Sequence, residues 1–447
     1  MKKIKFALVV LASVVLSACG GGGGAAAPTT VSSTPIDLCA VESKNYGDVA
    51  IPSGYLGTYT IPTAAGRLAN GVVRTADLAD WDYWWSRPAS VLCTDKIAYL
   101  KNVNRETIRR LAAIGVDRIY ISNIGSWDNI ENSIWHIPEE NYSIPKIIQE
   151  YIVNEAHSRG VKVFLTWQHT NCDGSHGCSG YDPESMSESQ FTTLLNSWRQ
   201  HILEQAAYAK SIGIDGINVG IDNFTPNSIK NGGQFRNQYT DAISKLAQEL
   251  KLTFPGVLYF GGQNDDVYTE IIDAVDEFLY RIYAGSAAGT YGPGNPLSIS
   301  NIKSRMDQGF YWDVWRGGVD FANAGKINKP VIFKIYAQSN EYFYNGGWIE
   351  DNYCSEPCSL QRGAISNFSL QAIAYEAALQ FINEQRYVTV GGAGTYGYAF
   401  FDSLTETVMQ NGLPAIPING MSTFPNISNS IRNKPAEGIV RDWFRRQ

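Results

Sequence analysis

Acidic and amide side chains recur in this 447-residue chain at the points where short apolar segments end. Each segment has the length and composition of a buried β-strand, so these polar groups are expected at strand ends. Four carboxylates at such positions are candidate catalytic groups: Asp222, Glu341, Asp265 and Asp402. Carboxylates from separate strands that meet in one cleft can act as a general acid and its partner base, as in the cleavage of a glycosidic bond.

Aromatic rings and amides accompany these carboxylates. Flat rings beside amides suit the apolar faces and hydroxyl edges of sugars, which indicates a polysaccharide or an oligosaccharide as the partner. The candidate sugar contacts are Trp167, Gln168, His169, Asn223, Gln263, Tyr283, Tyr336 and Trp348. Core packing is the alternative for any single tryptophan, but the surplus of aromatic residues in loops favours sugar recognition.

Helical patterns and short apolar strands alternate from about residue 104 onward, and these elements must position the polar groups. The predicted strands are 117–122, 161–167, 216–221, 256–260, 278–283, 330–336 and 396–401, with a first strand somewhere between residues 45 and 99. Such alternation is typical of a parallel sheet covered on both faces. We predict an α/β fold, a closed (β/α)8 TIM-type barrel with an irregular N-terminal segment. An open doubly wound sheet is the alternative.

One helix boundary is especially clear in the sequence. Ser187 and Gln190 have the spacing of a capping box, and Gly213 is placed to end the same helix. We therefore predict a long helix between Ser187 and Gly213, ahead of the strand 216–221.

Composition and charge exclude several classes of protein. With 44% hydrophobic and 12% aromatic residues, the chain is expected to pack a core rather than to be disordered. Its net charge is −7 and it has no long basic run, which argues against nucleic acid as a partner. No Gly-x-Gly-x-x-Gly motif follows the early strands, so we expect no phosphate-cradling loop. We predict no cofactor and no metal.

The first residues are typical of export. Residues 1–18 combine three lysines with an apolar stretch too short to span a bilayer, as in a signal peptide. The segment 16–19, Leu-Ser-Ala-Cys, resembles the lipobox of bacterial lipoproteins, which implies lipidation of Cys19. Gly20 after that cysteine implies the outer membrane. We expect residues 19–36 to form a flexible Gly/Ala/Thr tether and residues 37–447 to form a single barrel domain with an N-terminal extension.

Six cysteines are left after Cys19, and export favours their oxidation to disulfides. In chain order they are Cys39, Cys93, Cys172, Cys178, Cys354 and Cys358. The sequence alone allows about fifteen pairings. A zinc site built from His169, Cys172, His176 and Cys178 is the alternative for the middle pair, but a disulfide competes for both of its cysteines.

Three segments resemble the clan A glycoside hydrolase barrels: 107–116 (TIRRLAAIGV), 156–163 (AHSRGVKV) and 208–215 (YAKSIGID). The pattern is most similar to the family 113 endo-β-mannanases over roughly residues 104–402. The resemblance implies an acid/base glutamate after strand 4 and a nucleophilic glutamate after strand 7. Asp222 stands at the first position. At the second position the chain reads Phe-Lys-Ile-Tyr over residues 333–336, with no acid until Glu341.

This departure from the family pattern changes the expected chemistry. A retaining site needs its carboxyls about 5 Å apart, whereas an inverting site separates them by about 6.5 to 9.5 Å to admit water. Because aspartate is shorter than glutamate, an inverting site that pairs Asp222 with Glu341, Asp265 or Asp402 is at least as plausible as the retaining double displacement of the family. The leading hypothesis is an exported, lipid-anchored hydrolase of a polysaccharide with Asp222 as general acid. The alternative is a non-catalytic carbohydrate-binding or cell-surface lipoprotein on a degenerate glycosidase barrel.

Overall fold

The computed structural model describes residues 56–78, 96–127, 135–136, 144–169, 171–172, 178–179, 186–221, 229, 233–261, 269–284, 297–316, 329–344, 367–398 and 429–446. These residues all belong to one compact unit of the chain, Pro35–Gln447.

Eight parallel strands in the described residues form a closed ring. In chain order they are β1 (Val73–Leu78), β2 (Arg118–Trp127), β4 (Lys162–His169), β7 (Gly216–Asn218), β8 (Val257–Gly261), β9 (Glu277–Tyr283), β10 (Val331–Tyr336) and β11 (Val390–Tyr398). Each strand pairs with the next, and β1 closes the ring by pairing with both β11 and β2. This confirms the predicted (β/α)8 TIM-type barrel.

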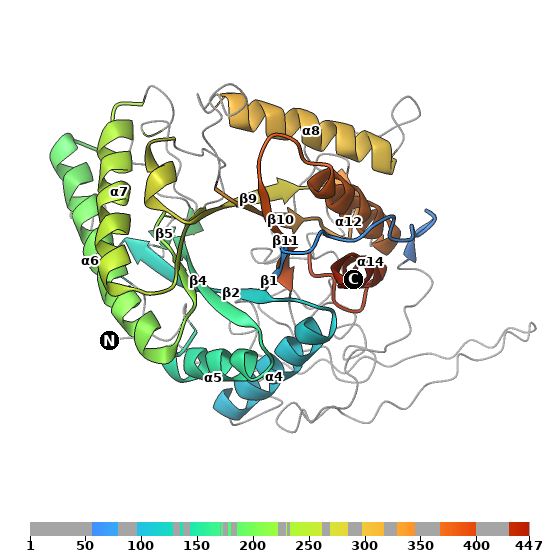
Figure 1. Ribbon diagram of the computed structural model, residues 1–447, viewed down its shortest axis with the longest axis horizontal. Helices are drawn as coiled ribbons and strands as arrows, with labels where there is room; N and C mark the ends of the chain where they lie inside the picture. The colour runs from blue at the N-terminus through green and yellow to red at the C-terminus, as the bar shows by residue number, and fades with distance from the viewer. Residues whose placement is uncertain are drawn as a thin grey trace, which may run out of the picture. The chain divides into compact units, whose positions relative to one another are not determined.

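Helices surround the ring of strands (Figure 1). They are α4 (Lys96–Ala113), α5 (Lys146–His157), α6 (Glu188–Ile212), α7 (Arg236–Thr253), α8 (Ile299–Arg316), α10 (Glu341–Tyr344), α12 (Phe368–Asn383) and α14 (Pro435–Phe444), with a 3-10 helix η3 at Thr269–Ala274. No helix within the described ranges combines the length and the apolar character needed to cross a bilayer.

Short strands lie beside the barrel. β3 (Trp135–His136) pairs antiparallel with the end of β2, and β5 (Asn171–Cys172) pairs antiparallel with β6 (Cys178–Ser179). The second hairpin brings Cys172 and Cys178 directly opposite each other. Cα atoms opposite each other in an antiparallel pair are about 4.5 to 5.5 Å apart, within the range of a disulfide.

Helix α6 begins and ends where the sequence predicts. The Ser187 side chain accepts a hydrogen bond from the backbone N–H of Gln190, and the Gln190 side chain accepts one from the backbone N–H of Ser187. Gly213 ends the helix with a φ of 85°, a left-handed conformation that glycine adopts without strain. The capping box and the C-terminal glycine are both confirmed.

The predicted strand 396–401 was wrong in its bounds, because β11 already begins at Val390. Glycines hide this strand from a search for apolar residues, yet they are what lets it pair closely with β1. A Cβ at Gly394 would lie 2.0 Å from Thr75 Oγ1, and one at Gly392 would lie 2.8 Å from the carbonyl oxygen of Val73. Only glycine fits so close an approach between strands.

The predicted strand 216–221 is also shorter in the structure, since β7 ends at Asn218. The side-chain oxygen of Asn218 accepts hydrogen bonds from the backbone N–H groups of Gly220, at 3.0 Å, and Gly261, at 3.3 Å. These side-chain bonds compete with the backbone ladder, so the strand ends three residues before the predicted position.

The interior of the barrel holds charged side chains rather than only branched aliphatic ones. Arg118 of β2 pairs with Glu277 of β9, and Lys334 of β10 pairs with Asp77 of β1. Neither pair joins neighbouring strands, so both must cross the inside of the ring. Burial raises the pKa of Glu277 above its usual range, and Arg118 opposes that rise.

Candidate functional site

Three tyrosines lie together at the carboxyl ends of the last three barrel strands. The ring of Tyr336 on β10 is 5.4 Å from the ring of Tyr283 on β9 and 5.3 Å from the ring of Tyr396 on β11. Tyr336 is buried, whereas Tyr283 and Tyr396 are half-buried. The structure therefore brings together two predicted sugar contacts, Tyr283 and Tyr336, and adds Tyr396. We call these three side chains the tyrosine group.

A buried amide network holds the middle tyrosine of this group in place. The hydroxyl of Tyr336 accepts a 2.9 Å hydrogen bond from the Gln338 side chain, whose oxygen accepts one of 2.9 Å from Asn340. Both amides are fully buried. Because buried polar groups with all partners in place fix a single arrangement, this network sets the orientation of Tyr336.

A cation lies against the tyrosine group from inside the barrel. The guanidinium carbon of Arg281 is 4.3 Å from the ring centre of Tyr396, which is a cation–π distance. Arg281 stands beside Lys334 in the register of β9 and β10, two residues before Tyr283 and Tyr336. The tyrosine group therefore lies next to two buried cationic side chains, Arg281 and Lys334.

Asp77 is a carboxylate at the end of β1 that the sequence analysis missed. Its Oδ2 atom is 2.8 Å from Lys334 Nζ, and the Lys334 ammonium lies 3.8 Å from the ring centre of Tyr120. Burial raises the pKa of Asp77 above its usual range, whereas Lys334 opposes that rise. Sequence periodicity did not locate the first strand, so Asp77 could not be recognised as a residue at a strand end.

Glu341 follows β10 and is the first residue of α10. It is half-buried, and its Oε1 atom accepts a 2.9 Å hydrogen bond from the side-chain nitrogen of Asn367. Asn367 caps α12, because its side-chain oxygen accepts a hydrogen bond from the backbone N–H of Leu370. Glu341 is therefore tied to the start of α12.

The other predicted site residues are described only in part or not at all. The backbone of Trp167, Gln168 and His169 lies in β4 and pairs with residues 123–125 of β2, but their side chains are outside the described set. The candidates that fall outside the described residues are Asp222, Asn223, Gln263, Asp265, Trp348 and Asp402, together with Cys19, Cys39, Cys93, Cys354 and Cys358. His176 is outside as well, so the zinc alternative stays open.

The described chain can be followed past β7 as far as the residue before Asp222. Ile221, the residue before Asp222, is described and buried just after β7. Since all eight strands run in the same direction, the chain after β7 emerges at the same edge of the ring as the tyrosine group. In TIM barrels this carboxyl edge is the one that carries active sites.

The fold and the side chains at its carboxyl edge together define the class of protein. It is a (β/α)8 barrel with aromatic and amide side chains at that edge. Solved glycoside hydrolases share this fold. A family 113 β-1,4-mannanase matches with a TM-score of 0.54 and 14% identity over 85% of this chain and 100% of that one. The family 113 β-mannanase from Alicyclobacillus acidocaldarius matches with a TM-score of 0.52 and 14% identity over 85% and 97%.

A more distant family has the same architecture. The family 5 mannosidase from Rhizomucor miehei matches with a TM-score of 0.50 and 12% identity over 88% of this chain and 96% of that one. No protein-family model matches the chain, and a search of curated proteins finds no relative. At these identities the likeness shows the fold alone.

Proposed function

We propose that this protein is an exported, lipid-anchored glycoside hydrolase that cleaves a polysaccharide at the carboxyl edge of the barrel. The observation that carries the proposal is the tyrosine group, because aromatic faces beside amides suit sugar rings and lie at the edge where the chain continues to Asp222. The similar solved barrels are named as mannanases and a mannosidase, so β-mannans are the first substrates to test.

In the proposed mechanism Asp222 is the general acid. It gives its proton to the glycosidic oxygen as the bond to the sugar breaks, while a second carboxylate takes a proton from the attacking water. Asp222 must hold its proton near neutral pH, so its pKa must lie well above the ordinary value of about 3.9. Asp265, Asp402 and Glu341 are the candidate partner bases.

Glu341 has a structural role of its own, which allows its catalytic role to be tested separately. We expect Glu341→Gln to unfold within about 2 °C of wild type, because the glutamine oxygen can still accept the hydrogen bond from Asn367. Sugar release should change by less than about threefold where Asp265 or Asp402 is the base, since only the loss of the base itself costs about a hundredfold or more. A loss above about a hundredfold with an unchanged unfolding temperature would place Glu341 in the reaction.

A specific observation favours the second candidate function, which is sugar binding without cleavage. The inward position near the end of β10 is Lys334, which is paired with Asp77, and Glu341 is bonded to Asn367. Neither arrangement offers a free carboxylate at the end of β10, which is the seventh strand of the barrel. A barrel with these features would bind a polysaccharide through the tyrosine group without cleaving it.

The proposed location rests on the sequence. A signal peptide over residues 1–18, lipidation at Cys19 and a tether over residues 19–36 would hold the barrel at the cell envelope, with the outer membrane as the expected site. Contact with the membrane would be through the lipid anchor only. The facing positions of Cys172 and Cys178 support a disulfide between them in that compartment.

One experiment distinguishes the two functions. The protein is incubated with mannans, galactans and bacterial capsular polysaccharides, and new reducing ends are measured alongside retardation in gels that contain each polymer. New reducing ends support hydrolysis. Retardation without new reducing ends supports binding alone, and neither effect on any polymer would contradict both functions for these substrates.

A further inference from the structure

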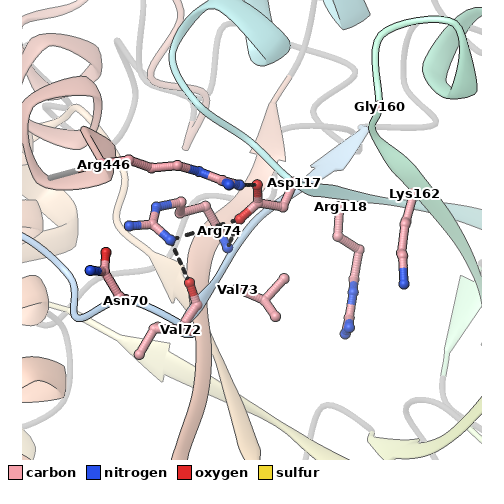
Figure 2. Close-up of a pocket in the computed structure, with 10 residues that line it drawn as sticks. Asn70, Val72, Val73, Arg74, Asp117, Arg118, Gly160, Lys162 and Arg446 are labelled. Carbon is pink, nitrogen blue, oxygen red and sulfur yellow. Dashed lines mark hydrogen bonds and ion pairs between the residues drawn. The ribbon is translucent and has the colours of Figure 1, made fainter.

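A pocket opens at the amino edge of the barrel, on the side opposite to the tyrosine group. Its volume is about 530 Å³, and it lies at the starts of β1, β2 and β4 (Figure 2). The polar side chains that line it are Asn70, Arg74, Asp117, Arg118, Lys162 and Arg446. In TIM barrels residues at this edge normally serve stability, so a charged pocket here needs its own explanation.

Positive charge dominates this pocket although the whole chain carries a net charge of −7. Four cationic side chains line it against a single carboxylate, Asp117. That carboxylate is already occupied, because its Oδ2 atom accepts a 3.1 Å hydrogen bond from the backbone N–H of Arg74 and its Oδ1 atom binds Arg446. Arg118 is paired with Glu277, whereas Lys162 has no carboxylate partner among the described residues.

Lys162 is the exposed cation of this pocket. Among the described residues its ammonium group has no hydrogen-bond or ion-pair partner, although its charge acts on Glu277 at longer range. It stands directly beside Arg118 in the register of β2 and β4, and Figure 2 shows the two side chains extending in the same direction. The pair offers two adjacent positive groups on one wall.

Arg74 and Arg118, which also line the pocket, have side-chain N–H groups that make no hydrogen bond to the described residues. Arg74 is 3% exposed and Arg118 is 5% exposed, yet Nη2 of Arg74 and Nε of Arg118 are buried and have no hydrogen-bond partner in the described part of the chain. A guanidinium presents its donors in a fixed fork that matches the oxygens of a phosphate or a carboxylate. The unused arginine donors and the charge of Lys162 both point to an anionic ligand.

We propose that this pocket binds a small oxyanion, namely the phosphate or carboxylate group of a molecule of about monosaccharide size. A volume of about 530 Å³ falls within the range of small-molecule sites and exceeds what a single oxyanion needs. Lys162 and Arg446 would contact the anionic group from the open side, with Arg74 and Arg118 behind them. The proposal does not depend on the hydrolase function, which concerns the opposite edge.

Calorimetric titration of the full chain with inorganic phosphate, a hexose phosphate and glucuronate, with glucose as the neutral probe, tests this site. We expect the anions to bind and glucose not to bind, with weaker affinity at about 0.15 M than at about 0.01 M salt. A preference for the hexose phosphate over glucuronate would identify phosphate as the recognised group. The opposite preference would identify the carboxylate.

Two variants locate the binding. Lys162→Gln should weaken anion affinity about tenfold, because one charge-assisted hydrogen bond is lost. Lys245→Gln removes the same charge from the exposed face of α7 and should leave the affinity unchanged. Arg446→Gln provides a second test on an exposed side chain if the first variant folds poorly.

The proposal is overturned if no anion binds, if glucose binds equally well, or if Lys162→Gln and Lys245→Gln have the same affinity. Anion binding that persists in Asp222→Asn, while sugar release is lost, would show that the pocket and the hydrolase site are separate.

Discussion

Replacement of Asp222 by asparagine is expected to lower sugar release by about a hundredfold or more. Asparagine has nearly the same size and shape, but it has no proton to give to the departing glycosidic oxygen. The variant should still bind the polysaccharide, because the tyrosine group is unchanged. Rates of reducing-end formation and gel retardation, measured side by side, separate the two effects.

The nature of the leaving group distinguishes a general acid from other roles. An aryl glycoside with an acidic phenol needs no proton as its bond breaks, so Asp222→Asn should cleave it nearly as fast as wild type does. Equal losses on the polysaccharide and on the aryl glycoside would contradict the acid role and would fit a residue that only shapes the site.

Asp215→Asn is the matched control for this prediction. Asp215 precedes the same strand, β7, at the amino edge, where its Oδ2 atom accepts a 2.8 Å hydrogen bond from the backbone N–H of Val163. The substitution is chemically identical but lies at the other end of the strand. We expect it to change sugar release by less than about twofold, since no catalytic group is removed.

Local patterns in the sequence predicted much of the barrel. The strands 161–167, 256–260, 278–283 and 330–336 agree with β4, β8, β9 and β10 to within two residues. They are apolar runs that follow helices, so neighbouring residues carry the information. The capping box at Ser187 is also local, since both of its hydrogen bonds join residues three apart.

The elements that escaped prediction depend on partners far away in the chain. β11 is rich in glycine because β1, more than three hundred residues earlier, packs against it. Asp77 and Lys334 are 257 residues apart, and Arg118 and Glu277 are 159 apart. No periodicity or motif records such pairings, so the charged interior of the barrel could not be inferred from sequence.

This charged interior also gives Lys334 of β10 a structural role. Lys334 points into the ring, where it meets Asp77 from β1 and the face of Tyr120. An acid at that inward position would place a second negative charge beside Asp77, which is already buried. A lysine at this position instead forms a buried ion pair with Asp77.

Replacement of Lys334 by methionine is therefore expected to lower the free energy of unfolding by about 3 to 5 kcal/mol at neutral pH, because Asp77 is left charged and unpaired inside the barrel. Methionine keeps the length and packing of the lysine stem, so little of the loss comes from a cavity. Urea unfolding of the variant and wild type gives the difference.

The pH dependence of this loss identifies Asp77 as its cause. Burial already raises the pKa of Asp77 in the wild-type fold above its ordinary value of 3.8, and removal of Lys334 raises it further. A carboxyl with a raised pKa in the fold contributes stability at low pH, and that stability is lost as the pH rises through the folded pKa. The penalty of Lys334→Met should therefore be small near pH 4 and should grow toward pH 7.

A second substitution should reverse most of the penalty at neutral pH. In Asp77→Asn/Lys334→Met no charge is left unpaired between β1 and β10, so the double variant should be more stable than Lys334→Met alone. It should also lose the dependence on pH, because asparagine does not titrate. If the single variant showed the same penalty at pH 4 and pH 7, the loss would come from packing around Tyr120 rather than from the charge on Asp77.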